Sequence, residues 1–230
     1  MDIFYSIVNF FVRGGVFMYP ILFVAAIAAA IAIERYVTLT RLSIKNRRAW
    51  NEIEPVIMEG NFDKAREATA KDDTAICQLL SVGLARQGAV RRVDDVEKAM
   101  RTSMMEIIPR FEKRTHYLGT FANLATLLGL LGTVSGLIHA FTSVATANPA
   151  EKANLLAASI SEAMNCTAFG LMVAVPLLFL HAFLQTKTGE LISSLETAAM
   201  KFLTLVGDRQ SARMQTRLEL AQVSQNKAAA

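Results

Sequence analysis

The sequence has little charge for its length and concentrates it in a few segments. Only 19% of its 230 residues are charged and 53% are hydrophobic, with a mean hydropathy of +0.33. Soluble domains average about 25% charged and 45–50% hydrophobic residues. Asp, Glu, Lys and Arg are absent from residues 14–33, 115–150 and 163–186, whereas residues 34–114 are densely charged. This separation predicts membrane-spanning helices around a polar domain rather than a soluble enzyme.

Cysteines and known catalytic motifs are also scarce. Cys77 and Cys166 form no CxxC or Cys/His ligand spacing, so neither a disulfide framework nor a zinc site is indicated, and we expect both to be buried. There is no Ser/His/Asp constellation, GxxxxGK[ST] phosphate loop, GxGxxG after a strand, or HExxH. The net charge of +4 without a clustered basic face does not imply nucleic acid. We therefore expect no enzymatic activity, no metal and no cofactor.

Three apolar runs are long enough to cross the bilayer as helices. The predicted order is an interfacial helix at the periplasmic side, the first span, the second span, a periplasmic link and the third span, over residues 1–15, 16–33, 115–141, 142–154 and 155–186. Because the link is short, the second and third spans should pack as an antiparallel pair. Asn148-Pro149 followed by Glu151 predicts that the third helix begins at the proline, before its apolar core.

The distribution of basic residues sets the expected orientation. Lys and Arg number one before the first span, sixteen in residues 34–114, one in the link and six after Thr186. Since basic loops stay cytoplasmic, the amino terminus should be periplasmic and the carboxyl terminus cytoplasmic. We expect residues 34–114 to form a cytoplasmic helical domain, with turns at Glu59-Gly60-Asn61 and Lys71-Asp72-Asp73 and one buried face formed by Ile76, Leu79, Leu80, Gly83 and Leu84. Residues 187–230 should form a C-terminal helix and tail, which from Asp208 is a fraying helix with a disordered end.

Small residues recur at steps of three and four along both later spans, which places them on one stripe of each helix. In the second span these are Gly119, Ala122, Thr126, Gly129, Thr133, Gly136, Ala140 and Ser143, and in the third Ser159, Ala163, Thr167, Gly170 and Ala174. Small residues let helix backbones approach closely in lipid, and Gly132 with Gly136 adds a GxxxG step. We interpret the glycines as packing residues and expect Pro176 to kink the third helix.

Polar groups in these spans have two interpretations each. Glu162 is either an ion-handling carboxylate inside the membrane or a solvated residue at its rim, and the first is favoured because an intramembrane carboxylate is costly without a role. Thr133 and Thr167 either offer hydroxyls to a path or bond back to their own helices. His116, His139 and His181 are expected to be interface or packing residues.

Two segments resemble the MotA/TolQ/ExbB family of bacterial inner-membrane ion-channel proteins. They are GLLGTVSGLIHAF at residues 129–141 and ISEAMNCTAFGLMVAVP at residues 160–176, with Glu34-Arg35 closing the first span. The likeness is specific over the second and third spans and weak over residues 42–114. Three spans rather than four favour the ExbB/TolQ branch.

The resemblance implies an all-α integral membrane protein of the cell inner membrane, assembled as a homo-oligomeric ring that is usually pentameric in the family. The ring would surround the helices of an ExbD- or TolR-like single-span partner and drive a TonB- or TolA-like energy transducer with H⁺, or alternatively Na⁺. By position, Thr133 and Thr167 match pore-facing threonines of the family and Glu162 matches its glutamate in the third span. Family members carry the ion-binding aspartate on the partner helix, and the spans of this chain contain no aspartate.

Several functions remain open at this stage. The first is an ExbB-like subunit energising outer-membrane transport, and its neighbour is a TolQ-like subunit of the Tol-Pal envelope-integrity system. A partner-independent channel is disfavoured because three spans without an internal repeat offer no inverted-repeat site. A membrane scaffold would use the small stripes only for packing.

Overall fold

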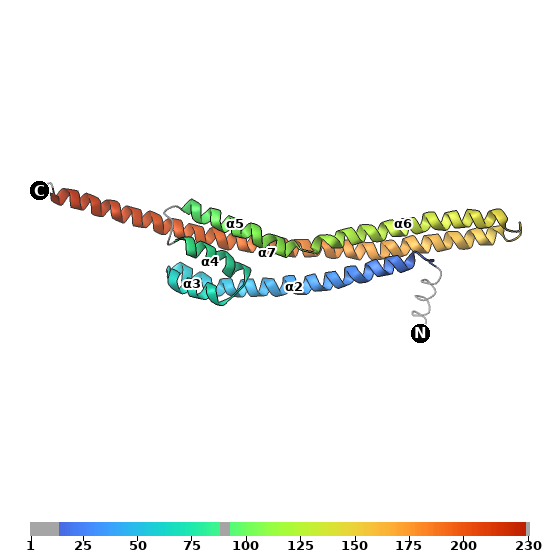
Figure 1. The fold of residues 1–230 in the computed structure, drawn as a ribbon, viewed down its shortest axis with the longest axis horizontal. Coiled ribbons are helices and arrows are strands. Elements are labelled where there is room, and N and C mark those ends of the chain that lie inside the picture. Colours follow the sequence, from blue (N-terminus) through green and yellow to red (C-terminus); the bar gives the residue numbers. More distant parts are fainter. Residues whose placement is uncertain (1–13, 88–92, 229–230) are drawn as a thin grey trace. The chain divides into compact units, whose positions relative to one another are not determined.

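The structure, a computed structural model, describes residues 14–87 and 93–228. The expected interfacial helix at residues 1–15 lies, apart from Gly14 and Gly15, outside the described residues. All regular structure in the described ranges is helical (Figure 1). The helices are α2 (Met18–Glu59), α3 (Phe62–Lys71), α4 (Ala75–Gln87), α5 (Val93–Glu112), α6 (Thr115–Thr146) and α7 (Lys152–Ala228).

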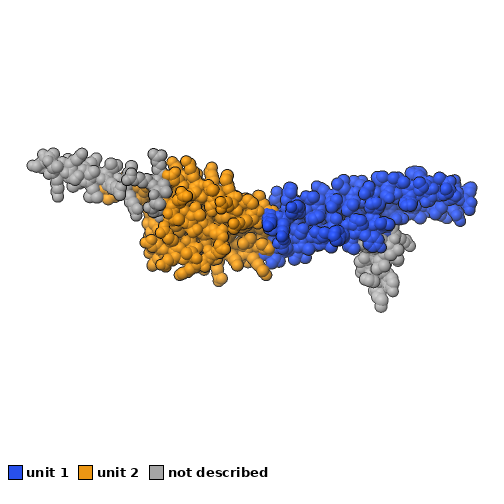
Figure 2. Space-filling model, viewed as in Figure 1, with its two compact units in different colours: residues 1–37, 113–186 blue, residues 38–112, 187–230 orange. Residues whose placement is uncertain are grey.

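The chain forms two compact units (Figure 2), and α2 and α7 contribute to both. Unit 1 contains the chain up to Val37 and residues 113–186, and unit 2 contains residues 38–112 and the chain from Lys187 onward. Three helical stretches among the described residues are long and apolar enough to cross a membrane, in α2, α6 and α7. This agrees with the three spans predicted from the charge-free runs.

Unit 1 is a bundle of the first part of α2, all of α6 and the first part of α7. The expected antiparallel pairing of the second and third spans is present, because Gly136 contacts Ala163 at one end of the pair and Gly119 contacts His181 at the other. The bundle core is built largely from small and β-branched side chains. Its buried members are Ile21, Val24, Ala28, Ala122, Ala125, Cys166, Ala174 and Leu177.

Unit 2 has a larger core of conventional hydrophobic side chains. Ile76, Leu79, Leu80 and Leu84 of α4 are all buried, as their spacing predicted. At the predicted turn after Glu59, Gly60 has a φ of +78°, and the amides of Gly60 and Asn61 donate to the carbonyls of Ile57 and Val56. This Schellman arrangement ends α2. The side chain of Asn61 then accepts from the Lys64 amide and caps α3.

The structure corrects two expectations about the last helix. α7 begins at Lys152 rather than at Pro149, because Asn148 to Glu151 form a turn in which the Asn148 carbonyl accepts from the Glu151 and Lys152 amides. The chain also stays helical from Asp208 to Ala228, so the expectation of a disordered end was wrong for these residues.

The start of that tail is packed in unit 2 rather than free. Val206 is buried in the core, and the Arg209 guanidinium donates to the carbonyls of Gly60 and Glu59 at 2.9 and 3.0 Å. α7 passes through Pro176 as one helix, and Pro176 leaves the Met172 carbonyl without its usual helical donor. Both cysteines are buried, as expected.

Candidate functional site

The backbones of α6 and α7 meet where Gly129 faces Gly170. A β-carbon added at Gly170 would lie 2.7 Å from the Ala125 carbonyl oxygen and 3.0 Å from the Gly129 α-carbon. A β-carbon added at Gly129 would lie 3.3 Å from the α-carbons of both Gly170 and Thr167. Only hydrogen fits at these two positions without moving a backbone, so the two glycines set the distance between the helices.

The other two glycines of the predicted packing set follow on the same side of α6. A β-carbon at Gly136 would lie 2.7 Å from the Ala163 β-carbon, and one at Gly132 would overlap the Cys166 sulfur. The contacts therefore extend over two turns of α6 beyond Gly129. The predicted glycine stripe lies at the helix–helix contact over this length.

The two threonines differ in what their hydroxyls bond. The Thr133 hydroxyl donates to the Leu130 carbonyl of its own helix at 2.6 Å. The Thr167 hydroxyl instead crosses to α6 and donates to the Gly129 carbonyl at 2.8 Å. A hydroxyl bond between helices adds about 0.6 kcal/mol on average in a membrane protein, and up to about 1.7. Thr167 thus ties the two helices together beside the glycine contact.

Glu162 lies level with the beginning of the first span. The side chain is exposed, and its carboxylate sits against Gly15, so that a β-carbon there would overlap the carboxylate. Gly15 has a φ of +76°, which favours glycine, and it comes three residues before the start of α2. Glu162 therefore lies at the end of the three-helix bundle where α2 begins, rather than midway along the bundle.

The structure does not bring Glu162 and the threonines together within one chain. Five residues separate Glu162 from Thr167 on α7, which corresponds to about 140° around the helix and about 7.5 Å along it. Glu162 faces the start of α2, whereas Thr167 faces α6 at Gly129.

Three ionic side chains, Glu34, Arg35 and Arg114, lie close together at the opposite end of unit 1. Arg114 is the only described non-glycine residue with a positive φ, at 67°, in the break between α5 and α6, and its guanidinium donates to Glu34 at 3.0 Å. Arg35 is only 5% exposed, and its Nε has no hydrogen-bond partner within the described chain. Burial lowers the pKa of Arg35; the Glu34 carboxylate opposes this effect and Arg114 adds to it.

The histidines at this end pack as the sequence suggested. The Nδ1 of His181 lies 3.0 Å from the Thr115 carbonyl oxygen, so Nδ1 carries the proton in this contact. The rings of His116 and His181 meet edge to face, with centroids 6.4 Å apart. The described residues contain no group of three or more His, Cys, Asp or Glu side chains placed to hold a metal ion.

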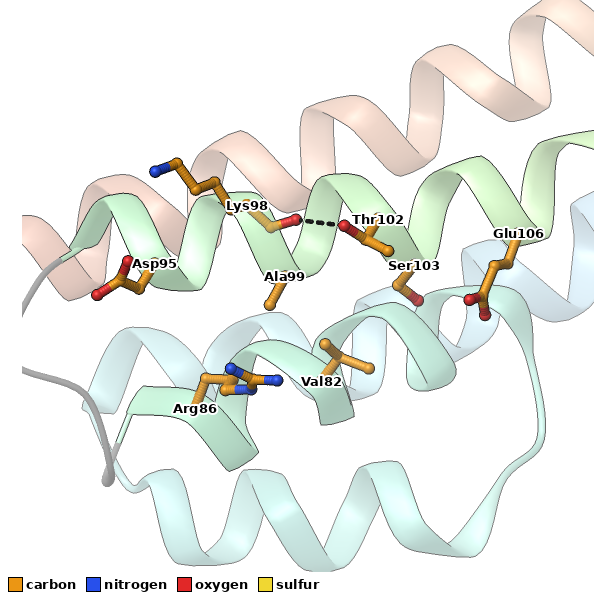
Figure 3. Close-up of a pocket in the computed structure, with 8 residues that line it drawn as sticks. All are labelled: Val82, Arg86, Asp95, Lys98, Ala99, Thr102, Ser103 and Glu106. Carbon is orange, nitrogen blue, oxygen red and sulfur yellow. Dashed lines mark hydrogen bonds between the residues drawn. The ribbon is translucent and has the colours of Figure 1, made fainter.

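Unit 2 contains a separate hollow of about 580 Å³ between α4 and α5 (Figure 3). Its lining mixes two bases, Arg86 and Lys98, with two acids, Asp95 and Glu106. The Thr102 hydroxyl at its wall is bonded to the Lys98 carbonyl at 2.9 Å. Mixed exposed charges of this kind select no single ligand, so we place the candidate site in unit 1.

Sequence reasoning missed Gly15 and Asn123. Gly15 precedes the first span and carries no motif, so nothing in the sequence signalled its contact with Glu162. Asn123 is an exposed amide inside a charge-free run, and its polarity in that context was an available signal. The contact between Thr167 and Gly129 also needed the register of the two helices, which neither stripe specifies.

Comparisons with known proteins agree with this architecture. The model of the MotA/TolQ/ExbB proton channel family matches residues 71–197. The chain is 30% identical over 200 residues to an ExbB-like protein of Synechocystis sp., covering 86% of this chain and 74% of the relative. It is 34% identical over 100 residues to biopolymer transport protein ExbB of Neisseria gonorrhoeae, covering 44% and 45% of the two chains.

A third relative comes from the other branch of the same family. Tol-Pal system protein TolQ of Haemophilus influenzae is 38% identical over 79 residues, or 34% of each chain. The family match covers the α6–α7 contact and extends about ten residues into the part of α7 that belongs to unit 2. It therefore includes the glycine and threonine positions described above. With its three long apolar helices and this match over more than half its length, the chain belongs to the MotA/TolQ/ExbB proton channel family, in the ExbB/TolQ branch.

Proposed function

We propose that this protein is a subunit of an inner-membrane ion motor that couples the proton motive force to outer-membrane transport. The observation that carries the proposal is the close contact of α6 and α7 at Gly129 and Gly170, bridged by the Thr167 hydroxyl. This contact brings the two charge-free helices close together, and the hydroxyls of Thr133 and Thr167 lie on the pair. Such a pair suits the wall of a path in which another helix moves, because few strong bonds would hold that helix in place.

One chain does not supply all the groups that an ion path across the membrane would need, which supports a role for partners. The spans contain no aspartate, and Glu162, their one carboxylate, lies at the end of the bundle where α2 begins. We therefore propose a ring of copies, five as is usual for the family, around an ExbD- or TolR-like single-span partner that supplies the missing carboxylate. A TonB- or TolA-like protein would receive the motion. Each charge moving through 100 mV releases about 2.3 kcal/mol.

The proposed ion is H⁺, with Na⁺ as the alternative. Threonine hydroxyls and one carboxylate are hard oxygen ligands that suit either ion. The family description names a proton channel, which favours H⁺.

We propose a multi-pass topology with the amino terminus periplasmic and unit 2 in the cytoplasm. The cluster of Glu34, Arg35 and Arg114 at one end of unit 1 supports this orientation, since basic residues beside a span remain on the cytoplasmic side. Glu162 would then lie at the periplasmic end. A reporter fused after Ala230 should be active only if it works in the cytoplasm.

Between the two branches, we favour an ExbB-like role. The relatives that match most of this chain, at 86% and 74% of its length, carry ExbB-like names. The TolQ relatives match 34% and 50% of it. A TolQ-like role in the Tol-Pal system is the second candidate.

The test is complementation by Glu162→Gln and Thr167→Val, with Thr167→Ser as the matched control that keeps the hydroxyl. Strains are scored for iron–siderophore uptake and for detergent resistance, and membrane levels and oligomer size are measured in parallel. Loss of uptake at normal levels, with Thr167→Ser active, is the expected result. Loss of detergent resistance alone would assign the TolQ-like role.

Two outcomes would contradict the motor proposal. If both variants behave as the unmodified protein, the residues are not on an ion path and the protein is better explained as a scaffold. If the purified chain without partners conducts ions in vesicles, it is a self-contained channel.

A further inference from the structure

We propose that α6 carries a water-filled access path on the face formed by His116, Thr120 and Asn123, leading from the cytoplasm into the membrane. This inference rests on the proposed function, in which an ion must reach or leave the helix pair from the inner side. We call these three residues the inner polar face.

Asn123 is the strongest observation. Its side chain is exposed in unit 1 and lies eight residues after the start of α6, which is about 12 Å along the helix. The described chain offers its amide no hydrogen bond, and the side chain is too short to reach the end of the span. Leaving an amide unbonded in hydrocarbon is strongly unfavourable, so a second molecule must satisfy it.

The inner polar face is continuous from the end of the helix to Asn123. Positions 116, 120 and 123 follow steps of four and three, so they lie on one line, and all three are exposed. Other threonines of α6, at 126, 133 and 142, donate to carbonyls of their own helix. The structure gives the Thr120 hydroxyl no such bond within the described residues, which leaves it available to water.

Beyond Asn123 the same line becomes apolar. Leu127, Leu130 and Val134 continue it, and they are 61%, 51% and 55% exposed. The polar part is therefore confined to the inner part of the span and opens toward the end that holds Arg114. Polar side chains near the end of a span are common on lipid-facing helices too, so the observation that favours a half-channel is the depth of Asn123, about 12 Å from the start of α6.

The side chains of a neighbouring copy in a ring do not supply the missing partner. Rotation about the membrane normal keeps every residue at its own depth, so Asn123 of one copy meets only residues of that depth in the next. The register of α6 against α7 puts the exposed side chains Met172, Val175 and Phe179 at this depth, and all three are apolar. On α2 the contacts of Phe17 with Gly132 and of Glu34 with Arg114 put Asn123 level with Ala26, and the exposed residues around it, Ala26 and Ala29, are also apolar. The Met172 carbonyl, which Pro176 leaves without its helical donor, is a polar backbone group near this depth. Because the inner polar face is continuous to the cytoplasmic end of α6, we favour water, which can reach Asn123 along that face.

The test is the accessibility of a cysteine at position 123. The full chain carrying Asn123→Cys, expressed with its partners, is treated with a charged, membrane-impermeant methanethiosulfonate in inverted and in right-side-out membrane vesicles. Val175→Cys, 63% exposed at a similar depth on α7, is the matched control. The unmodified protein provides the background, since both native cysteines are buried.

We expect Asn123→Cys in inverted vesicles to react about tenfold or more faster than Val175→Cys, because the reactive thiolate forms only in contact with water. Equal slow rates for the two variants would overturn the proposal. Reaction in right-side-out vesicles alone would overturn its cytoplasmic direction. A disulfide-linked dimer formed through position 123 would show that a second copy covers the face, and would also overturn it.

A second pair of variants tests the role of the amide. Asn123→Ser keeps a small polar group and should retain siderophore uptake, whereas Asn123→Leu should reduce uptake severalfold at unchanged membrane level. Equal uptake by both would contradict an access path. Labelling does not depend on ion flow, so the two proposals fail separately. If Glu162→Gln and Thr167→Val are silent while position 123 labels, the motor proposal fails; if they abolish uptake while position 123 does not label, the access path fails.

Discussion

Substituting Gly170 by alanine should destabilise the protein although alanine is the better helix former. In a helix interior, Gly→Ala normally gains about 0.5–1 kcal/mol. At Gly170 the added methyl group would lie 2.7 Å from the Ala125 carbonyl oxygen and 3.0 Å from the Gly129 α-carbon. Both are backbone atoms, so the helices themselves must separate.

The magnitude follows from two losses. Forcing one carbon into a tight contact costs about 1–3 kcal/mol. Separating the helices also weakens the bond from Thr167 to Gly129, which contributes about 0.6–1.7 kcal/mol. After the gain in helix propensity is subtracted, Gly170→Ala should lose about 1–3 kcal/mol. For a chain of this size that corresponds to a fall of several degrees in the unfolding midpoint, at about 2–4 °C per kcal/mol.

Gly189→Ala is the matched control because Gly189 lies on the same helix with nothing within 4 Å of an added β-carbon. The midpoint is measured on the purified complex in detergent, as the temperature at which half of the monodisperse peak is lost in size-exclusion chromatography. We expect Gly189→Ala to raise the midpoint slightly and Gly170→Ala to lower it. If Gly170→Ala also raises the midpoint, the close contact of α6 and α7 is not present in the protein.

Gly136→Leu should abolish the oligomer on native gels, because a β-carbon added at Gly136 would lie 2.7 Å from the Ala163 β-carbon and force α6 and α7 apart; an intact oligomer would place Gly136 off a packing face. Thr133→Leu should insert normally but stall siderophore uptake, and normal uptake would exclude this position from the path wall. Gly15→Ala should lower the unfolding midpoint, since Gly15 has a φ of +76° and abuts the Glu162 carboxylate; additional Glu162→Ala should restore part of the loss, and no restoration would refute the contact. Burial, with smaller contributions from the Asp72 and Glu52 carboxylates, raises the pKa of the Cys77 thiol against the opposing bond from Thr74. Above about pH 8.5 the Cys77 thiol of the unfolded chain loses its proton, whereas the thiol of the folded protein keeps it. The free energy of unfolding should therefore fall as the pH rises above this value. An equal pH dependence of stability in Cys77→Ala would refute this.

Much of the architecture was readable from the sequence for simple physical reasons. Charge-free runs of about 20 residues have few alternatives to spanning a membrane, so the three long helices and their order followed directly. The buried face of α4 and the turn at Gly60 followed from periodicity and turn chemistry. The two wrong boundaries of α7 share a cause, since helix ends depend on local bonds that a single sequence states weakly. The start of its tail is also ordered by Arg209, whose contacts with Gly60 and Glu59 are distant in sequence.

For the candidate site, too, the sequence predicted the features that depend on a single helix and did not predict those that depend on how the helices pack. Sequence periodicity was enough to place the small residues on stripes, because it depends only on the pitch of one helix. It did not contain the register between helices, which packing of the whole bundle sets. That register turns Thr167 toward the Gly129 carbonyl while Thr133 bonds within its own helix, and it puts Glu162 at the end of the bundle where α2 begins, against Gly15. It also leaves Asn123 exposed with no partner in the described chain, a property that depends on which faces of α6 the other two helices cover.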